Sequence, residues 1–434
     1  MAEYRASRSR ACERDRSKKR TTTNRNLLVQ RLTNQIRRYD WGSTTAIPAL
    51  LGVRPDGGPQ AELWIGAHPD SPSVLPDGRS LDLALAADGL RLLGPDVHDV
   101  FGPRLPFLTK VLAASAPLSL QVHPDQRQAA AGFAAEEAAG VARDARQRRY
   151  KDPFHKPEVV VALDAVEALC GWRDPAETRR LMAVLDVRHP LWKHLDALLD
   201  GDPPQALQRA VAWLLTAGSD VADLVHAVAA AAAGRDDRPE FSTTAELARI
   251  HPGDPGVVVA LLLNRVTLAR REALYLPAGN VHAYLRGTAV EVMAASDNVL
   301  RAGLTTKHVD AEELLRTVDW TPRPLPCVRP IRDGVWCHYR PAAAEFQLAW
   351  AELGEAPSDR WHDAPETGPR VVLALNAPVH VRAGGVTLEL ASGDVVLVGH
   401  ADGPLVLRGA GTAVVVAVPP IHRSAPEAGP VVTS

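Results

Sequence analysis

Short apolar runs separated by turn residues fill the first third of the chain. Between residue 27 and about residue 163 they include "AELWIGAHPD", "RLPFLTKVL" and "PLSLQVHPD", with Gly, Pro and Asp between them. Short strands at this spacing predict a β-sandwich or barrel rather than alternating βαβ units.

The period of the apolar positions changes between Asp174 and about Ile250. Asp174 and Pro175 resemble an N-cap and a first-turn proline, and "AETRRLMAVL" then places apolar residues at helical spacing. Thr243 and Glu246 form a possible capping box before "LARI". This stretch predicts a helical insertion.

The strand pattern returns in "ALYLPAGNVHAYL" and in most of 371–418. In the second of these regions, "ASGDVVLV" places a Gly-Asp turn before an apolar strand, which is common in cupin-like barrels. The pattern as a whole therefore predicts a mainly β fold with an α-helical insertion.

Length and composition exclude several classes of protein. A chain of 434 residues with 46% hydrophobic residues predicts more than one packed domain. The net charge of −2 argues against a dedicated nucleic-acid binder. No apolar run approaches the ~20 residues of a membrane span, and no apolar segment of a secretory signal follows the first basic residues. We therefore expect a cytoplasmic protein.

The four cysteines show no CxxC spacing, so they predict neither a disulfide framework nor a thiolate zinc site: Cys12, Cys170, Cys327 and Cys337. Residues 1–25 hold nine Lys or Arg against three acidic residues and almost no large apolar side chain. We interpret residues 1–26 as a disordered basic tail, with an arm for an anionic partner as the alternative.

Four polar residues are candidate metal ligands. Gln121 and His123 lie two apart in "SLQVHPD", so a strand would place both side chains on one face. Glu158 opens the apolar strand "VVVAL", where a buried carboxylate needs water or a cation. His282 follows the turn "LPAG" at a predicted barrel rim.

Together these residues offer two imidazoles, one carboxylate and one amide oxygen. Zinc accepts such nitrogen and oxygen ligands, but iron and manganese do so too, and the ligand types alone do not decide between them. Taken singly, each residue also has an ordinary structural interpretation. His68, His251, His308 and His400 have no partner at metal spacing in the sequence, and Trp41 and Trp64 are expected to be packing residues.

Several motifs, in this order, resemble the type I phosphomannose isomerase family. They are "YDWGS", "AELWIGAHPDSPSVL", "LPFLTKVL", "LSLQVHPD", "YKDPFHKPE", "LPAGNVHAYL" and "VEVMAASDNVLRAGLTTKHVD", over about residues 31–320. The resemblance implies a zinc enzyme on a cupin-like (double-stranded β-helix) barrel. It also implies the interconversion of mannose 6-phosphate and fructose 6-phosphate through an enediol, which supports mannose metabolism and GDP-mannose supply.

The resemblance assigns roles to individual residues. It implies one Zn²⁺ per chain, held by the four candidates named above: Gln121, His123, Glu158 and His282. It places an active-site arginine at Arg301 and substrate-pocket lysines at Lys156 and Lys307. Ser119 and Lys110 match further substrate-binding positions. Phe154 and Thr306 depart from the residues usual in the family, which puts the local shape of the pocket and the range of sugar phosphates in doubt.

Aldose–ketose isomerisation needs an electrophile for the carbonyl, a base for the C2 proton and cations for the phosphate. Arg301 stays protonated, so it suits the phosphate or the enediolate. His155, Lys156 and Glu291 are alternative proton carriers, and the sequence does not choose among them. An iron-dependent cupin oxygenase and a non-catalytic sugar-binding cupin are the rival functions.

The resemblance and the periodicity together divide the chain. Residues 27–165 and 255–330 are expected to form a catalytic cupin-like domain, 166–254 a helical insertion domain, and 331–425 a C-terminal cupin-like β domain. The expected partner is a phosphorylated hexose, with no nucleic acid or membrane, in a monomer or weak homo-oligomer.

Overall fold

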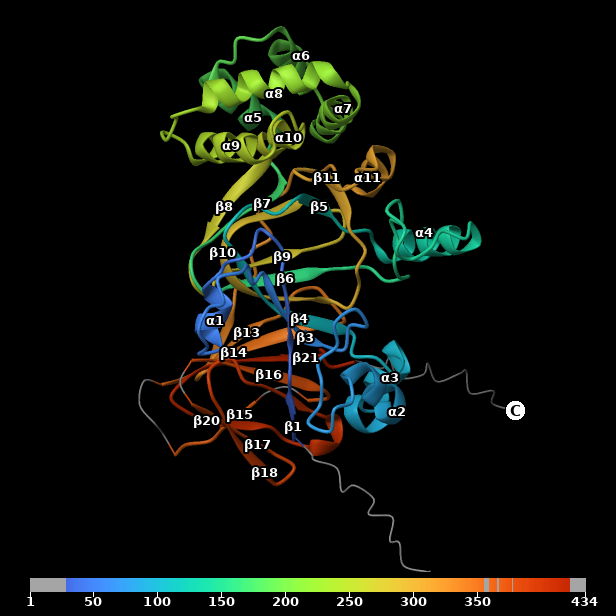
Figure 1. Cartoon of the computed structure of the whole chain (residues 1–434), viewed down its shortest axis with the longest axis vertical. Coiled ribbons are helices and arrows are strands. Elements are labelled where there is room, and N and C mark those ends of the chain that lie inside the picture. The colour runs from blue at the N-terminus through green and yellow to red at the C-terminus, as the bar shows by residue number, and fades with distance from the viewer. Residues whose placement is uncertain (1–28, 355–358, 365–366, 377, 422–434) are drawn as a thin grey trace, which may run out of the picture.

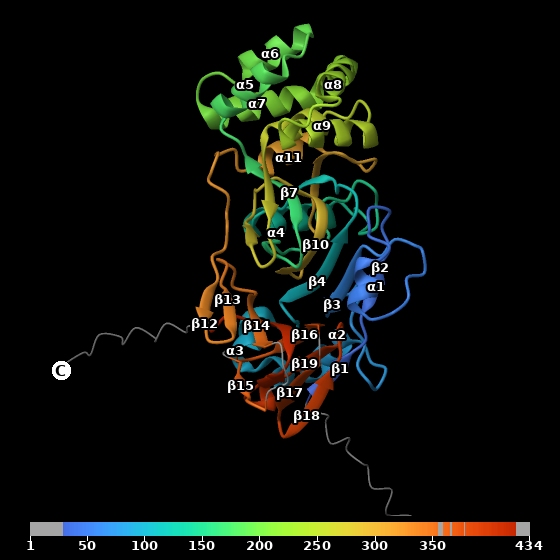
Figure 2. The ribbon, with the colours of Figure 1, turned by 90° about the vertical axis from the view of Figure 1, so that its left-hand side faces the viewer.

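The computed structural model describes residues 29–354, 359–364, 367–376 and 378–421 (Figure 1). The predicted basic tail, 1–26, lies outside the described residues. The described part is elongated, with a group of helices at one end, a ten-stranded sheet in the middle and two further sheets at the other end (Figures 1 and 2). The prediction of a mainly β fold with helices is confirmed.

The ten-stranded sheet is organised around its longest strand, β10, which pairs antiparallel with β4, β5, β6 and β7. All five residues of β6 are buried, as the apolar run after Glu158 predicts. The strands are β2 (Gln35–Arg37), β3 (Glu62–Gly66), β4 (Phe107–Ala114), β5 (Leu120–Val122), β6 (Glu158–Ala162), β7 (Val166–Trp172), β8 (Leu263–Leu268), β9 (Ala273–Leu276), β10 (His282–Ala294) and β11 (Leu300–Gly303).

Six helices follow one another at one end of this sheet: α5 (Pro175–Leu185), α6 (Pro190–Leu198), α7 (Pro203–Thr216), α8 (Ser219–Ala232), α9 (Pro239–Ile250) and α10 (Gly256–Leu261). The predicted start of the first is confirmed, because the Asp174 side chain accepts a hydrogen bond from Ala176 N and Pro175 occupies the first turn. The predicted capping box at Thr243 and Glu246 is wrong. Both residues lie inside α9, which begins four residues before Thr243, at Pro239.

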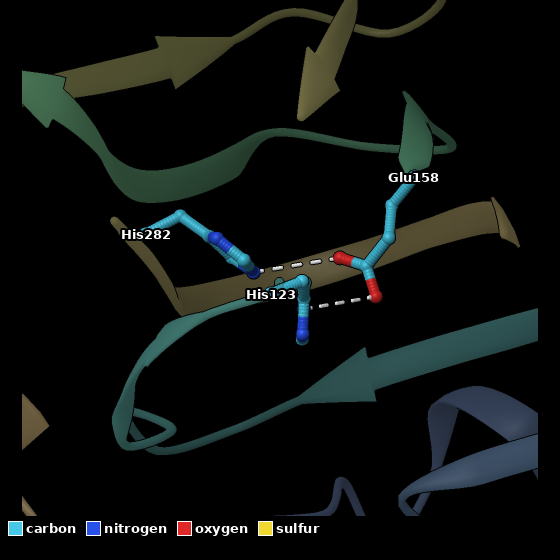
Figure 3. A group of neighbouring side chains, drawn as sticks. All are labelled: His123, Glu158 and His282. Atoms are coloured by element: carbon cyan, nitrogen blue, oxygen red, sulfur yellow. Dashed lines mark ion pairs between the residues drawn. The ribbon is translucent and has the colours of Figure 1, made fainter. Parts of the chain in front are cut away.

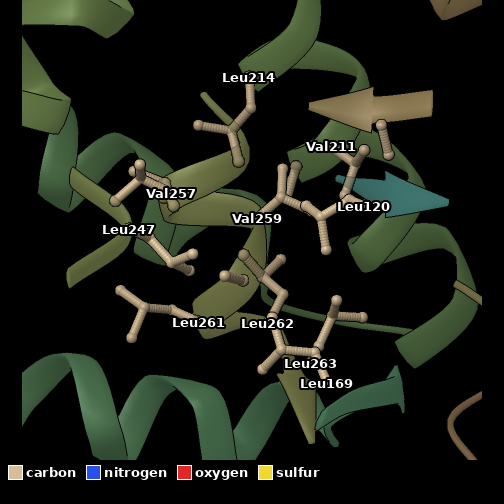
Figure 4. Close-up of a cluster of buried hydrophobic side chains, with 14 of the residues drawn as sticks. Leu120, Leu169, Val211, Leu214, Leu247, Val257, Val259, Leu261, Leu262 and Leu263 are labelled. Atoms are coloured by element: carbon tan, nitrogen blue, oxygen red, sulfur yellow. The ribbon is translucent and has the colours of Figure 1, made fainter. Parts of the chain in front are cut away.

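A shared apolar core attaches the helices to the sheet. Leu120 of β5 and Leu169 of β7 pack in one buried cluster with helix residues such as Val211, Leu214 and Leu247 (Figure 4). Full burial of each such side chain contributes about 1.5–3 kcal/mol. The helices therefore hold β5 and β7 in place. Gln121 lies on β5, and both strands pair with β10 at His282.

No single described helix is long and apolar enough to cross a membrane; α7 and α8 meet that test only as a pair bent by 107°.

The first third of the chain contains helices that the alternating pattern did not predict: α1 (Ala46–Leu50), α2 (Leu81–Leu93), α3 (Pro95–Phe101) and α4 (Gln126–Ala138). Asp125 is the N-cap of the last of these helices, a role that the sequence pattern did not predict for it. Asp125 accepts from Gln128 N at 2.7 Å, and Gln128 Oε1 accepts from Asp125 N at 2.9 Å. This reciprocal capping box starts the helix just after the strand that carries Gln121. A further helix, α11 (Ala311–Thr317), follows β11.

The C-terminal part forms a seven-stranded and a four-stranded sheet, as the strand pattern after residue 371 predicts. The seven-stranded sheet also contains the first described strand, because Val29 pairs with Val398 and Leu32 with Val395. The strands are β1 (Val29–Leu32), β12 (Ile331–Asp333), β13 (Trp336–Tyr339), β14 (Gln347–Gly354), β15 (His362–Asp363), β16 (Arg370–Asn376), β17 (Val379–Ala383), β18 (Val386–Leu390), β19 (Val395–Val398), β20 (Val406–Gly409) and β21 (Gly411–Ala417).

Gly287 is the position in β10 where a side chain is least tolerable. Its φ is +114°, and an added Cβ would lie 2.4 Å from Ala165 O. We expect Gly287→Ala to lower the free energy of unfolding by about 3 kcal/mol or more, because strain and a backbone clash add. Gly385→Ala is the matched control, since Gly385 has φ +81° and open space around it. Equal shifts of the denaturant midpoint in the two variants would contradict the clash.

Candidate active site

Three predicted metal ligands from the ten-stranded sheet and its loops come together at one buried point. His123 lies one residue beyond β5, Glu158 begins β6 and His282 begins β10. His123 Nε2 is 3.4 Å from Glu158 Oε1, and His282 Nε2 is 3.4 Å from Glu158 Oε2 (Figure 3). The three side chains are at most 3% exposed. Donors separated by 35 to 159 residues along the chain therefore share one buried point.

The backbone orients both imidazoles. His123 Nδ1 lies 2.8 Å from Asn298 O, and His282 Nδ1 lies 3.0 Å from Asn280 O. Since a carbonyl only accepts, each Nδ1 carries the proton and donates it. Each Nε2 lone pair then faces the Glu158 carboxylate, and a histidine that ligates a metal through Nε2 has this orientation.

The electrostatics of the cluster fit a divalent cation. Burial, followed by the positive charge of Lys156, lowers the pKa of His123 to about 4, so this imidazole is neutral. Burial alone would raise the pKa of Glu158, but the positive charge of Lys156 outweighs it and holds that pKa well below its usual value. His123 Nε2 is buried and has no hydrogen-bond partner among the described residues. Two imidazoles and one carboxylate are a set of donors that catalytic zinc uses.

Gln121 lies on the strand between two other candidate residues. It is directly opposite His282 of β10 on one side and Arg301 of β11 on the other. Directly opposed residues on antiparallel strands project their side chains to the same face. Its role as the fourth ligand stays a prediction, and this register supports it.

Two buried lysines lie near the three donors, Lys156 in the loop two residues before β6 and Lys110 on β4. Lys156 Nζ is 2.9 Å from Glu158 Oε1. Lys110 Nζ on β4 is 3.2 Å from Glu291 Oε2 and 3.6 Å from Glu62 Oε1. Burial raises the pKa of Glu291, although Lys110 opposes that shift. The site therefore contains a second ion-paired group, Lys110 with Glu62 and Glu291, in addition to the pair of Lys156 and Glu158.

Glu62 and Trp64 extend this second group, and the sequence analysis did not single out Glu62. Trp64 Nε1 donates to Glu62 Oε2 at 2.7 Å, and Lys110 Nζ lies 5.1 Å from the centre of the Trp64 rings. The sequence signal that could have identified Glu62 is its position two residues before Trp64 in "ELW", because residues two apart on a strand such as β3 share one face. Trp64 is 5% exposed and packs with Leu108 and Met293, so the expected packing role is confirmed, with a hydrogen bond in addition.

Three cationic side chains gather at the outer part of the site. Arg301 is half-buried on β11, and burial lowers its pKa. Lys307 is exposed; surrounding protein, then the charges of Arg301 and Lys151, lower its pKa. Ser119, half-buried, lies directly before β5 and two residues before Gln121. Lys151 lies in the quoted motif "YKDPFHKPE", but no role was predicted for it from the sequence.

His155 has a different environment from Lys156. Its Nε2 lies 2.7 Å from Glu345 Oε1, a residue of the C-terminal part, rather than beside Glu158. His155 and Phe154 line a cavity of about 210 Å³ with Arg104, whose guanidinium carbon is 3.8 Å from the centre of the Phe154 ring. Phe154, one of the departures from the family pattern, thus contacts this cavity, and Thr306 is exposed.

His68 has carboxylate partners that its sequence neighbours do not reveal. Its Nε2 lies 3.5 Å from Asp297 Oδ1, and Asp70 completes a second group of three possible ligands. The expectation that His68 has no partner at metal spacing is wrong. The sequence did not reveal this partner because Asp297 is 229 residues away along the chain. Arg143 lies 3.1 Å from Asp70 and 3.9 Å from Asp297, so a cation of the protein already balances these carboxylates.

Comparisons with known proteins agree on one family. Residues 29–175 match the family described as phosphomannose isomerase type I, catalytic domain. Mannose-6-phosphate isomerase of Escherichia coli (strain K12) is 35% identical over 390 residues, which cover 88% of this chain and 98% of that protein. Mannose-6-phosphate isomerase 1 of Arabidopsis thaliana is 30% identical, with 92% of this chain and 93% of that protein covered.

Solved structures give the same result. A crystal structure of mannose 6-phosphate isomerase from Salmonella typhimurium, bound to substrate and to a zinc atom, superposes with a TM-score of 0.83 at 34% identity. The superposition covers 90% of this chain and 99% of the Salmonella typhimurium chain. Since both the sequence and the fold match over nearly the whole length of these relatives, the chain belongs to the type I mannose-6-phosphate isomerase family.

Proposed function

We propose that this protein interconverts mannose 6-phosphate and fructose 6-phosphate with one zinc ion held by Gln121, His123, Glu158 and His282. The observation that carries the proposal is the convergence of two Nε2 atoms on one buried carboxylate, beside Lys156. The relative from Salmonella typhimurium, solved with its substrate and zinc, supports both the metal and the class of substrate.

The outer cations would bind the phosphate group. Arg301 keeps its charge at any working pH, and Lys307 and Lys151 add to the positive potential beside it. A phosphate held there is remote from the reacting carbons. Its binding energy then holds C1 and C2 in place for the chemical step.

The proposed reaction moves a proton between C2 and C1 through an enediol. When bound, zinc would act as a Lewis acid toward the carbonyl oxygen of the substrate. Of the three candidate bases, Lys156 and Glu291 lie among the buried charged groups of the site, whereas His155 Nε2 lies 2.7 Å from Glu345 Oε1. This placement favours Lys156 or Glu291 as the group that takes and returns the proton.

The proposal extends to the domain architecture and to the role of the protein in the cell. We propose cupin-like barrels for the catalytic part, residues 27–165 and 255–330, and for the C-terminal part, 331–425, with 166–254 as a helical insertion domain. Strand β7 occupies residues 166–172, at the start of the proposed insertion domain, and the six helices run from 175 to 261, seven residues beyond its proposed end. The proposed product serves mannose metabolism and GDP-mannose supply.

The proposed metal centre predicts a joint loss of zinc and activity. We expect His282→Ala and Glu158→Gln to lower zinc content and isomerase rate together, because each removes a buried donor and leaves the others unbalanced. Metal analysis and a coupled assay on mannose 6-phosphate, with and without chelator, measure both. His226→Ala is the control, since His226 is exposed on α8. Metal-stripped protein that keeps its full rate would refute the proposal.

The role of Arg301 predicts a loss of rate without loss of metal. We expect Arg301→Ala to keep its zinc and to lower kcat by about 10²-fold, as the removal of one group that stabilises transition-state charge does elsewhere. Arg286→Ala is the matched control, because Arg286 lies on the same sheet but is exposed and pairs with Glu246. Wild-type turnover in the Arg301 variant would remove its assigned role.

A further inference from the structure

Asn298 joins two loops that carry active-site residues. It lies between β10 and β11, next to Asp297, and is 0% exposed. The facing loop, residues 151–154, leads directly to Lys156 and Glu158. The two loops are about 145 residues apart in sequence, so side-chain hydrogen bonds rather than chain connectivity hold them together.

The Asn298 amide uses both of its ends on the facing loop. Its Nδ2 donates to Asp152 O at 2.7 Å and to Phe154 O at 2.8 Å. Its Oδ1 accepts from Lys151 N at 2.7 Å. These partners fix the orientation of the amide. If it were reversed, Oδ1 would face two carbonyl oxygens and Nδ2 would face an N–H group, so no hydrogen bond could form. No other side chain of similar size offers two donors and an acceptor in this shape.

The main chain of Asn298 contacts the metal cluster. Its carbonyl oxygen accepts the Nδ1 proton of His123 at 2.8 Å. That hydrogen bond fixes which nitrogen of His123 faces Glu158 and in which direction the ring points. One residue therefore holds His123 through its backbone and the segment before Glu158 through its side chain.

We propose that Asn298 is the positioning residue of the metal centre, setting the distance between His123 and Glu158 by joining the loop before β6 to the turn before β11. The inference rests on the proposed zinc site and adds a residue to it. Small displacements matter here, because zinc binds nitrogen and oxygen ligands within a narrow range of about 2.0–2.2 Å.

Asn298→Asp tests the proposal with almost no change in shape. The carboxylate keeps an acceptor for Lys151 N but turns its other oxygen toward the carbonyls of Asp152 and Phe154, where a donor is needed. We expect the zinc affinity, measured by competition with a chelator, to fall about 10–100-fold, as is typical when a partner of a ligand is lost. The cobalt-substituted protein should show an altered absorption spectrum, which reports ligand geometry independently of activity.

Asn264→Asp is the matched control. The Asn264 amide also donates to backbone carbonyls, those of Cys170, Gly171 and Trp172 of β7, and these lie outside the two loops that Asn298 joins. It should lose thermal stability and keep its zinc affinity within about two-fold. Equal losses of zinc affinity in both variants would mean general destabilisation and would overturn the proposal. Wild-type affinity and an unchanged cobalt spectrum in Asn298→Asp would do the same.

Ser296→Ala covers the case in which Asn298→Asp does not fold. Ser296 Oγ donates to Asp152 Oδ1 at 2.8 Å and to Phe154 O at 3.1 Å, and accepts from Asn298 N at 3.2 Å, so its loss loosens the same junction mildly. We expect a several-fold weaker zinc affinity, and an unchanged affinity would refute the inference. Wild-type protein that binds no zinc would refute the proposed metal centre as well, which separates the two failures.

Discussion

The structure of the site depends on a carboxylate buried where water does not reach it. Glu158 is 2% exposed, and a charge in that position is unfavourable by several kcal/mol unless cations compensate it. Lys156 supplies one positive charge at 2.9 Å, while two imidazoles present lone pairs rather than protons. One carboxylate and two Nε2 lone pairs directed at the same buried point make these three side chains a good site for a divalent ion.

The sheet satisfies this constraint through its connections. Strand β10 pairs with four neighbours, so residues from distant segments reach one point without long loops. The same register places Glu291 opposite Lys110, and Gln121 between His282 and Arg301. The helices α5–α10 contribute no residue to the three donors; they bury the apolar residues of β5 and β7 and so keep the ligand strands in position.

Local signals in the sequence predicted well, and distant pairings did not follow from them. Asp174 with Pro175 marked a helix start because the N-cap interaction involves adjacent residues. Thr243 with Glu246 has the spacing of a capping box, yet the first turn of α9 lies upstream at Pro239. The four metal candidates came from weak local patterns, which only the order of the family motifs combined into one site. The partnership of His68 with Asp297 and the effect of Lys151 on the pKa of Lys307 depend on proximity across the fold, which no local pattern contains.

The pairing of β1 with β19 has a consequence for the order of assembly on the ribosome. Val29 is among the first described residues to be synthesised, and its partner Val398 follows 369 residues later. At translation rates of about 5–20 residues per second, roughly 20–70 s pass before that edge of the seven-stranded sheet can close. The ten-stranded sheet, whose last strand ends at Gly303, is complete in sequence well before then. The nascent chain thus carries β1 without its partner strand through most of its synthesis, and the last sheet to be complete in sequence is the one that contains both the first and the last described strand.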